Sequence, residues 1–282
     1  MSEPTPQTMS DAPLVAIVGG GVMGGTIVTA LRVAGWPQDK IVVVEREEVR
    51  ATALREGHGI AVTDSIAEAA KDADVIVIAV KPVDAAESLE QISPAYKDGA
   101  LIFTVVAGLP ASFYERRLPP NTPVVRAMPN TPSIVARGAT AIAAGAHATE
   151  EHLALASSML RATGLVVTVD ESQLDAVTAV SGSGPAYFYA VVEALTEAGV
   201  AQGLDRELAT QLATQTFVGA AHLLMESGDT PQTLRKRVSS PGGTTIAALG
   251  ALEHAGLQGV ISSGANAAAH RSKELAQELG DD

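Results

Sequence analysis

The sequence predicts an α/β protein in which a doubly wound parallel sheet of the Rossmann type comes first and an all-helical region follows. From Pro13 to about Asp170, short and continuously apolar runs alternate with helical or loop segments. Such runs are typical of strands that are covered on both faces. After Asp170 the strand-like runs stop and helical periodicity takes over. We therefore expect a disordered leader at 1–12, a sheet domain at 13–170 and a helical domain at 171–282.

The first apolar run, Leu14–Val18, ends in a glycine-rich turn. Gly19, Gly21 and Gly24 fit the pattern G-x-G-x-x-G. There the first glycine permits a tight turn, the second lets a pyrophosphate approach the backbone, and the third lets a helix pack close to the strand. The helix start then points unpaired N–H groups at the phosphates. The motif alone is weak, but a helix at Thr26–Ala34 and a second strand after it indicate a Rossmann-type dinucleotide-binding domain.

The other elements of this domain follow in order along the chain. We expect strands at Leu14–Val18, Ile41–Val44, Val75–Val80, Leu101–Val106, Val124–Met128, Ala139–Ala143 and Leu165–Val169. We expect helices at Thr26–Ala34, Arg46–Glu56, Ile66–Ala73, Ala85–Ile92, Ser112–Arg117 and Glu150–Ala162. Because most of the strands are apolar without alternation, both faces of the sheet should be covered by helices.

Capping residues divide the helical region. Pro185, Asp205 and the pair Thr230–Pro231 each mark the start of a helix. We expect helices that end near Gln202, Ser227, Val238, Gly256 and Leu279. One of them is apolar over much of its circumference, through Leu208, Leu212, Phe217, Val218, Ala220, Ala221 and Leu224. A small domain cannot bury so much alone, which favours an oligomer interface over burial against the first domain.

Composition excludes several classes of protein. The 282 residues are 46% hydrophobic and 18% charged, as in a globular chain, and the net charge of −13 disfavours nucleic acid and anionic membranes as partners. The chain has no cysteine and its six histidines are dispersed, so we expect no metal site. Met1–Asp11 is polar and lacks a signal-peptide pattern, and no stretch is a convincing membrane span. We therefore expect a cytoplasmic protein.

Glu45 and Arg46 follow the second strand, where a dinucleotide's ribose is usually recognised. An acidic residue there accepts from the ribose 2′-OH and favours NAD, whereas a nearby arginine accommodates the 2′-phosphate of NADP. Both are present, so the residues leave the choice open. Arg46 as an exposed charge at a helix start is the plainer alternative.

Three further strand ends should lie at the same edge of the sheet, where doubly wound sheets bind ligands. Lys81, in Ala79–Pro82, reaches a phosphate or ribose there, or is a solvated loop lysine. Val105–Gly108 offers a floor for the nicotinamide. Asn130, held between two prolines, either binds a ligand or forms an ordinary turn.

Small residues break the helical region twice, at Ser181–Pro185 and at Ser239–Thr245. The second break places hydroxyls beside backbone N–H groups at a helix start, which suits a carboxylate. A capping turn is the simpler reading. Neither break carries His or Lys, which suggests a reduction that needs little acid–base help.

The chain resembles pyrroline-5-carboxylate reductases over almost its whole length from Leu14. The motifs that carry the resemblance are, in order, Gly19–Gly24, Ala79–Pro82, Met128–Pro132, Ser181–Tyr187 and Ser239–Thr245. The resemblance implies the last step of proline biosynthesis, in which NAD(P)H reduces the C=N bond of L-1-pyrroline-5-carboxylate to L-proline. It also implies a homo-oligomer, either a dimer with intertwined helical domains or a decamer of such dimers.

The resemblance also implies roles for individual residues. The substrate side would comprise Glu171, Ser240, Gly243, Thr244 and Thr245, with the Thr245 hydroxyl facing the ring nitrogen as the catalytic group. The cofactor side would comprise Val18, Gly19, Gly20, Gly21, Val22, Met23, Gly24, Glu45, Arg46, Ala79, Val80, Lys81, Pro82, Val105, Val106, Ala107 and Asn130. We expect NADP(H) to be preferred, with NAD(H) as the alternative. Val105, Val106 and Glu45 depart from residues common in the family, which bears on the cofactor and not on the reaction.

Two other functions compete with this interpretation. A β-hydroxyacid dehydrogenase also joins a Rossmann domain to a helical one, but it carries a lysine on the helix after its Gly-Ser-Gly segment. Here Pro-Ala-Tyr-Phe-Tyr follows Gly184, and no lysine comes before Lys236. A non-enzymatic nucleotide-binding protein would keep the fold without needing the Ser239–Thr245 loop.

Overall fold

The computed structural model describes residues 12–280, which form two compact units. The first comprises residues up to Gly182 together with residues from Ala268 onward, and the second is Ser183–Ala267. The expected leader at Met1–Asp11 lies outside the described residues, and Ala12 is already buried. The expected domain boundary after Asp170 stays a prediction, because a compact unit need not coincide with a functional domain.

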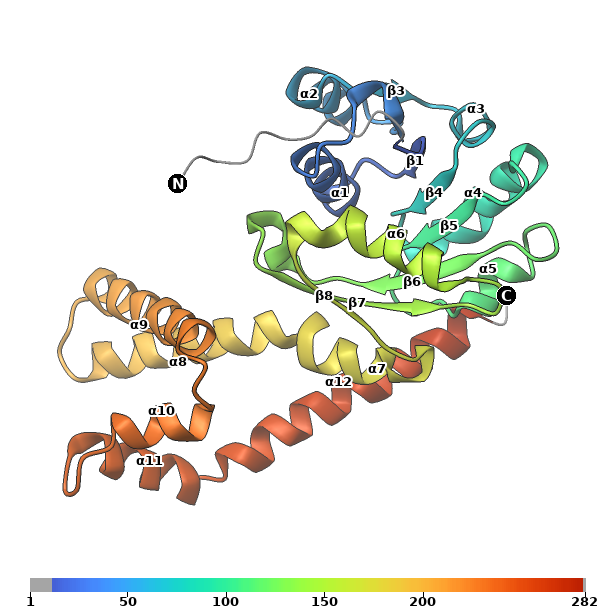
Figure 1. Cartoon of the computed structure of the whole chain (residues 1–282). Helices are drawn as coiled ribbons and strands as arrows, with labels where there is room; N and C mark the ends of the chain where they lie inside the picture. Colours follow the sequence, from blue (N-terminus) through green and yellow to red (C-terminus); the bar gives the residue numbers. More distant parts are fainter. Residues whose placement is uncertain (1–11, 281–282) are drawn as a thin grey trace. The chain divides into compact units, whose positions relative to one another are not determined.

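An eight-stranded sheet forms the centre of the first unit, in the order β3-β2-β1-β4-β5-β6-β7-β8 (Figure 1). The strands are β1 (Val15–Val18), β2 (Ile41–Val44), β3 (Ala61–Thr63), β4 (Val75–Ile78), β5 (Leu101–Thr104), β6 (Val124–Met128), β7 (Gly138–Ala144) and β8 (Gly164–Thr168). This confirms the α/β class. The short edge strand β3 was not expected from the sequence.

The last part of the sheet runs against the rest. The strands β1 to β6 are parallel, whereas β7 pairs antiparallel with β6 and parallel with β8. The expectation of an all-parallel sheet is therefore wrong at this edge. Only residues 129–137 connect β6 to β7. A parallel crossover needs about a dozen residues or more, so this short connection returns the chain in the opposite direction.

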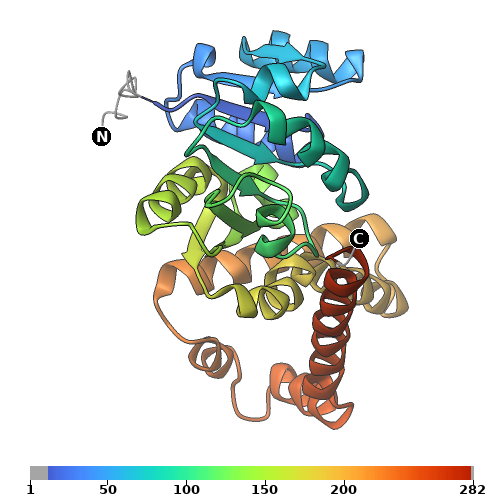
Figure 2. The same cartoon turned by 90° about the vertical axis from the view of Figure 1, so that its right-hand side faces the viewer.

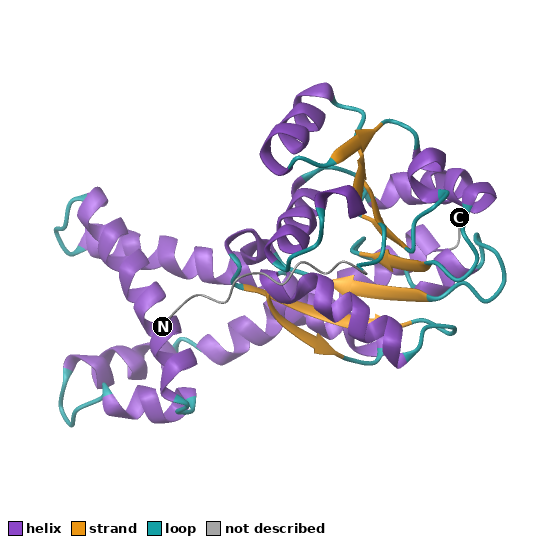
Figure 3. Ribbon diagram, turned by 45° about the horizontal axis from the view of Figure 1, so that its top comes forward, coloured by secondary structure: helices purple, strands orange, loops and turns teal. Residues whose placement is uncertain are grey.

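Helices cover both faces of the sheet (Figures 2 and 3). Those of the first unit are α1 (Val22–Val33), α2 (Glu48–His58), α3 (Ile66–Ala70), α4 (Ala85–Ile92), α5 (Ala111–Glu115), α6 (Glu150–Leu160) and α7 (Leu174–Val177). Alternate strand residues belong to two different core clusters: Val15 and Ile17 pack with α1, α2 and α6, and Ala16 and Val18 pack with α3, α4 and α5. Both sets are apolar, which explains the continuous apolar runs.

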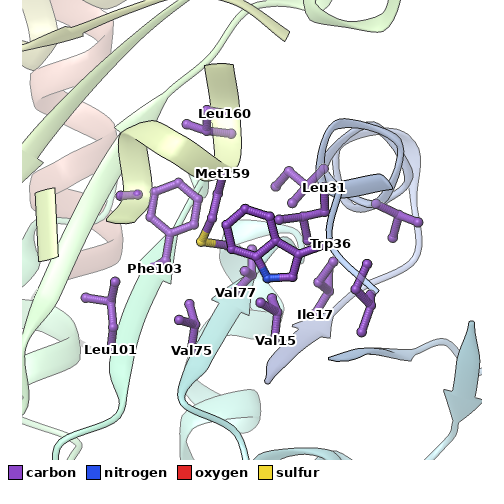
Figure 4. Packing of buried hydrophobic residues seen from close by; sticks show 14 of the residues in the cluster. Val15, Ile17, Leu31, Trp36, Val75, Val77, Leu101, Phe103, Met159 and Leu160 are labelled. Carbon is purple, nitrogen blue, oxygen red and sulfur yellow. The ribbon is translucent and has the colours of Figure 1, made fainter. Parts of the chain in front are cut away.

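Trp36 lies at the centre of the first cluster (Figure 4). Its ring packs among strand side chains, Leu31 of α1 and Met159 of α6, and only 1% of the residue is exposed. The indole N–H donates to the Pro13 carbonyl oxygen at 3.3 Å, which satisfies the one polar atom of the ring.

The second unit is helical, as the sequence predicts. Its helices are α8 (Gly184–Ala201), α9 (Arg206–Ser227), α10 (Pro231–Arg237), α11 (Thr244–His254) and α12 (Leu257–Gly280), the last of which ends in the first unit. Asp205 and Thr230 cap α9 and α10 through their side chains, as expected. The break expected at Ser181–Pro185 is a π-helical turn over Thr178–Gly182, directly before α8.

Many large apolar side chains of these helices are exposed in the single chain. Leu208, Leu212 and Leu224 of α9 are each at least 40% exposed. An exposed apolar surface of this extent marks a protein interface. Among the described helices, none is long and apolar enough to cross a membrane.

Candidate functional site

The glycine loop has the geometry that a dinucleotide site requires. Gly19 has a φ of +105°, and a Cβ there would lie 2.5 Å from the carbonyl oxygen of Ala79. A Cβ on Gly24 would lie 1.9 Å from the Gly19 carbonyl oxygen, so only glycine lets α1 approach the turn so closely. A Cβ on Gly21 would meet nothing within 4 Å, which leaves open space above the backbone.

The helix after this loop begins at Val22. The sequence predicted a start at Thr26, four residues later. Its N-cap is Gly21, and no side chain caps it. The first N–H groups of α1 therefore lack an intrahelical partner and face the loop, where they suit a phosphate. The earlier start brings Val22 and Met23 into the first turn of the helix.

A cavity of about 380 Å³ opens at the carboxyl ends of β1, β2 and β4. This is the edge at which strand order reverses in a doubly wound sheet and at which such sheets bind ligands. Its lining brings together many of the predicted cofactor residues: Val18, Gly19, Gly21, Glu45, Arg46, Ala79, Val80 and Lys81. Open space at Gly21, uncapped N–H groups and the cationic side chains of Arg46, Arg50 and Lys81 together fit a dinucleotide phosphate.

Sequence reasoning missed Arg50, which also lines the cavity. Arg50 lies four residues after Arg46, near the start of α2, and its guanidinium binds the Glu45 carboxylate. The spacing was a usable signal within the predicted helix Arg46–Glu56, because residues four apart share one face of a helix. In the structure α2 begins at Glu48, so Arg46 lies just before the helix and Arg50 in its first turn. Arg46 itself pairs with Glu87 at 3.7 Å, and both side chains are well exposed.

Other predicted cofactor residues lie outside this lining. Gly20 packs against Glu45, since a Cβ there would lie 2.9 Å from a carboxylate oxygen. Pro82 begins a short 3₁₀ turn after Lys81. At the end of β5, Val106 is buried in the core, Val105 is half-buried and Ala107 is exposed. Their contact with a cofactor stays a prediction.

A buried hydrogen-bond chain supports the end of β5. The Val106 N–H donates to Thr104 Oγ1 at 3.2 Å, and the Thr104 hydroxyl donates to the Tyr114 oxygen at 2.8 Å. Burial raises the pKa of Tyr114 to about 12, although the bond from Thr104 and the charge of Arg126 oppose the rise. Tyr114 therefore stays neutral and holds the strand end in place.

Asn130 and Glu171 are both held by protein groups. The Asn130 amide donates to the Ser181 carbonyl oxygen at 3.0 Å and accepts from the Ala139 N–H at 2.9 Å. The Glu171 carboxylate accepts from Arg126 Nη1 and from the Ala111 N–H, each at 2.7 Å. The Arg126 side chain is only 15% exposed and therefore largely shielded from water, whereas the Glu171 side chain is 35% exposed. Each of the two residues thus joins separate segments of the first unit.

The predicted substrate loop lies in the second unit, between α10 and α11. Gly242 has a φ of +72°, and the Gly243 N–H donates to the Ser240 carbonyl oxygen at 2.9 Å, which closes a tight turn. Gly243 is the N-cap of α11, and Thr244 and Thr245 are its first residues. No side chain caps this helix, and no acidic residue lies in its first turn. Its N–H groups are therefore suited to an anion.

In the part of the chain that the structure describes, no group of three or more His, Cys, Asp or Glu side chains could hold a metal ion.

Comparisons with known proteins match both parts of the chain. The model of the pyrroline-5-carboxylate reductase dimerisation region matches residues 171–275, and that of the coenzyme F420-dependent NADP oxidoreductases matches residues 14–108. Pyrroline-5-carboxylate reductase of Mycobacterium tuberculosis is 43% identical over 93% of this chain and 96% of its own length. The enzyme of Pseudomonas aeruginosa is 40% identical over 95% and 98%.

Solved structures agree with these relatives. The pyrroline-5-carboxylate reductase of Coxiella burnetii superposes with a TM-score of 0.90 at 36% identity, covering 94% of this chain and 98% of that one. The enzyme of Plasmodium falciparum, solved with NADP bound, gives a TM-score of 0.81 at 27% identity over the same shares. With relatives this similar along nearly all of its length, the chain belongs to the pyrroline-5-carboxylate reductase family.

Proposed function

We propose that this protein reduces the C=N bond of L-1-pyrroline-5-carboxylate to give L-proline, the final step of proline biosynthesis, with NAD(P)H as the reductant. The observation that carries the proposal is the match to pyrroline-5-carboxylate reductases over at least 93% of the chain. It covers both the glycine loop and the Ser239–Thr245 turn, so neither half of the site is missing.

The reaction asks little acid–base chemistry of the protein. A nicotinamide bound in the cavity would supply the hydride that the imine carbon takes up, and the ring nitrogen would gain one proton. A cyclic iminium is already electrophilic, so the chain's residues mainly have to orient it. This agrees with turns that carry hydroxyl and backbone N–H groups but neither His nor Lys.

We assign the substrate carboxylate to the start of α11. Ser240, Gly243, Thr244 and Thr245 would hold it, the uncapped N–H groups would provide the attraction, and the Thr245 hydroxyl would face the ring nitrogen. Local donors of this kind matter because the net charge of −13 repels an anion at long range. Glu171, the first residue after the predicted domain boundary at Asp170, would also contact the substrate.

We assign the cofactor to the cavity at the ends of β1, β2 and β4. The pyrophosphate would lie on Gly19–Gly24, with Val22 and Met23 beside it, and the ribose near Glu45 and Arg46. Ala79–Pro82, Val105–Ala107 and Asn130 would continue the cofactor side. NADPH is the preferred reductant in this proposal, supported by the cationic side chains of the cavity and by the NADP bound to the Plasmodium falciparum enzyme.

The protein forms a homo-oligomer through its helical region, which matches a dimerisation region and exposes apolar side chains. We propose that the unit is a dimer and that dimers assemble further into a decamer. Sedimentation velocity distinguishes the two. Because the reaction draws on NAD(P)H, which cells hold in the cytoplasm, we place the protein there, and fractionation of its native cells tests this.

The direct test is the oxidation of NADPH and NADH, followed at 340 nm, with and without pyrroline-5-carboxylate. We expect oxidation that depends on the imine, with formation of proline. If neither cofactor is oxidised even at high protein concentration, the proposed function is wrong. A 3-hydroxy acid that drives reduction of NADP⁺ or NAD⁺ instead would favour the β-hydroxyacid dehydrogenase.

A further inference from the structure

Glu45 occupies the position that usually selects NAD, yet its carboxylate is already engaged by the protein. Its Oε2 accepts from Arg50 Nε at 2.9 Å, and its Oε1 accepts from Arg50 Nη2 at 3.1 Å and from the Glu47 N–H at 2.8 Å. Its side chain is only 7% exposed. These bonds fill three of the about four acceptor sites of a carboxylate, and the remaining site lies on a side chain that is almost fully buried, so little capacity is left for a ribose hydroxyl.

The pKa of Glu45 agrees with this geometry. Burial raises the pKa of the carboxyl, but the bonds from Arg50 and from the Glu47 backbone outweigh it and hold the pKa below its usual value. Glu45 is therefore charged at neutral pH, and that charge is compensated inside the protein by Arg50. It repels a phosphate far less than an unpaired carboxylate would.

Gly20 makes this arrangement sterically possible. A Cβ on Gly20 would lie 2.9 Å from Glu45 Oε2 and 2.9 Å from Leu54 Cδ1. The absence of a side chain at this variable position of the glycine motif lets the carboxylate fold back beneath the loop. The space beside Gly20 thus accommodates the Glu45 carboxylate in its pair with Arg50.

Arg50 faces the cavity with donors to spare. A guanidinium carries five N–H groups, and Arg50 gives two to Glu45 and one to an ion pair with Glu47. Two N–H groups remain on a side chain that is half exposed at the cavity wall. Its bidentate contact with Glu45 fixes the plane of the guanidinium, which matters for binding a tetrahedral anion.

Arg46 supplies a second guanidinium at the same wall. It contacts Glu87 at 3.7 Å, with both side chains more than 60% exposed, and such pairs exchange partners at little cost. Asp84 and Glu87 also line the cavity and oppose an anion. The two arginines must therefore act locally, at one phosphate, and not through the overall charge of the cavity.

We propose that Arg50 and Arg46 bind the ribose 2′-phosphate of NADPH and that Glu45 is a positioning residue for Arg50, so that the acidic residue at the ribose position favours NADPH instead of NADH. The inference deepens the proposed function by naming what selects its cofactor. It concerns nucleotide binding alone, so it can be tested without the imine.

The test is calorimetric titration of the full-length protein with adenosine 2′,5′-bisphosphate and with 5′-AMP, two fragments that differ only in the 2′-phosphate. We expect Glu45→Gln to raise the Kd of the bisphosphate about tenfold, the size of one charge-assisted hydrogen bond, and to leave that of 5′-AMP within about twofold. If Glu45 instead accepted the ribose hydroxyl, Glu45→Gln would tighten the bisphosphate and weaken 5′-AMP. That outcome, or no change with either fragment, overturns the proposal.

Further variants separate positioning from folding. Arg50→Ala should weaken the bisphosphate at least as much as Glu45→Gln, and the double variant no more than Arg50→Ala, because Glu45 acts through Arg50. Arg50→Lys keeps the charge but loses the bidentate pair and should recover only part of the affinity. The matched control is Arg55→Ala: Arg55 lies on the same helix and pairs with Glu48 at 2.8 Å, but it does not line the cavity. An equal loss in Arg55→Ala would refute the assignment.

The two proposals fail in different ways. Normal discrimination between the fragments with no turnover of the imine would contradict only the proposed function. Turnover of the imine with unchanged 2′-phosphate discrimination in Glu45→Gln and Arg50→Ala would contradict only this inference.

Discussion

Gly24→Ala should destabilise the first unit, whereas the same change at the next residue, Gly25→Ala, should stabilise it. Both glycines lie inside α1. A Cβ on Gly24 would lie 1.9 Å from the carbonyl oxygen of Gly19, where ordinary contact begins at 3.4 Å, but a Cβ on Gly25 would meet nothing within 4 Å. The Gly19 backbone cannot retreat easily, since its N–H donates to the Val44 carbonyl oxygen at 3.1 Å.

The expected magnitudes follow from these contacts. Alanine in place of glycine inside a helix adds about 0.5–1 kcal/mol to the free energy of unfolding, and Gly25→Ala should gain this amount. Gly24→Ala gains the same helical contribution but has to displace α1 from the turn. Overpacking costs about 1–3 kcal/mol, and a clash with backbone belongs at the upper end. We therefore expect a net loss of about 2 kcal/mol, and a difference of about 3 kcal/mol between the variants.

Urea unfolding followed by tryptophan fluorescence measures this difference in the right part of the molecule. Trp36 is the one tryptophan of the chain and is buried in the core of the first unit, so its emission reports that unit and not the helical one. At an unchanged slope m, the shift in midpoint gives the change in free energy. If Gly24→Ala is as stable as Gly25→Ala, the close approach of α1 to the glycine turn is not as described.

Three other predictions concern the substrate turn and the buried polar pairs. Thr245→Ala should lower kcat/KM for the imine by about a hundredfold with little change in NADPH affinity, and loss of nucleotide binding instead would contradict the assignment. The raised pKa of Tyr114, about 12, means that its neutral form stabilises the fold fully below pH 10 and that this stability is lost as the pH rises toward 12. Urea midpoints at pH 8 and pH 11 should show that loss, and Tyr114→Phe should remove it while costing about 1 kcal/mol at pH 8, because the Thr104 hydroxyl loses its acceptor. Glu171→Gln should lower the free energy of unfolding by about 1–3 kcal/mol, since it leaves the Arg126 charge shielded and without its carboxylate; an unchanged midpoint would refute this.

Apolar runs were a sufficient guide to most of the sheet. The strands at Ile41–Val44 and Val124–Met128 and the helix at Ala85–Ile92 have the bounds that the sequence predicts. This worked because the sheet is covered on both faces, so every strand residue is under the same demand for an apolar side chain. The edge strand β3 was not predicted, because its three residues are not buried and form no continuous apolar run.

Strand direction was not available from the same pattern. An apolar run reads alike in either direction, and β7 resembles its parallel neighbours in composition. The direction is decided by the connection, and residues 129–137 are too few for a helical crossover. The length of that connection can be read from the sequence, but its two prolines indicate a rigid loop and carry no information on strand direction.

The cofactor site shows where residue type alone stops being informative. Glu45 and Arg46 were predicted from their place after β2, and both line the cavity. What their order could not convey is that α2 brings Arg50 back onto Glu45 and that Gly20 leaves room for the pair. An acidic residue at this position favours NADH when it faces the ribose. In our proposal it favours NADPH, because an arginine holds it away from the ribose.

The predicted site contains two kinds of hydrogen-bonding group: side chains that already have protein partners, and helix starts that have none from a side chain. The amide of Asn130 and the carboxylates of Glu45 and Glu171 each have at least two protein partners. The starts of α1 and α11, in contrast, have no side-chain cap. Protein bonds already fill part of the capacity of the first set, with both bonds of Glu171 on its Oε1, whereas at the helix starts a ligand adds bonds that the protein does not make itself. We therefore expect the backbone N–H groups after Gly21 and Gly243 to carry most of the binding of the phosphates and the carboxylate, with Glu171 and Asn130 adding contacts through the hydrogen-bonding capacity that they retain.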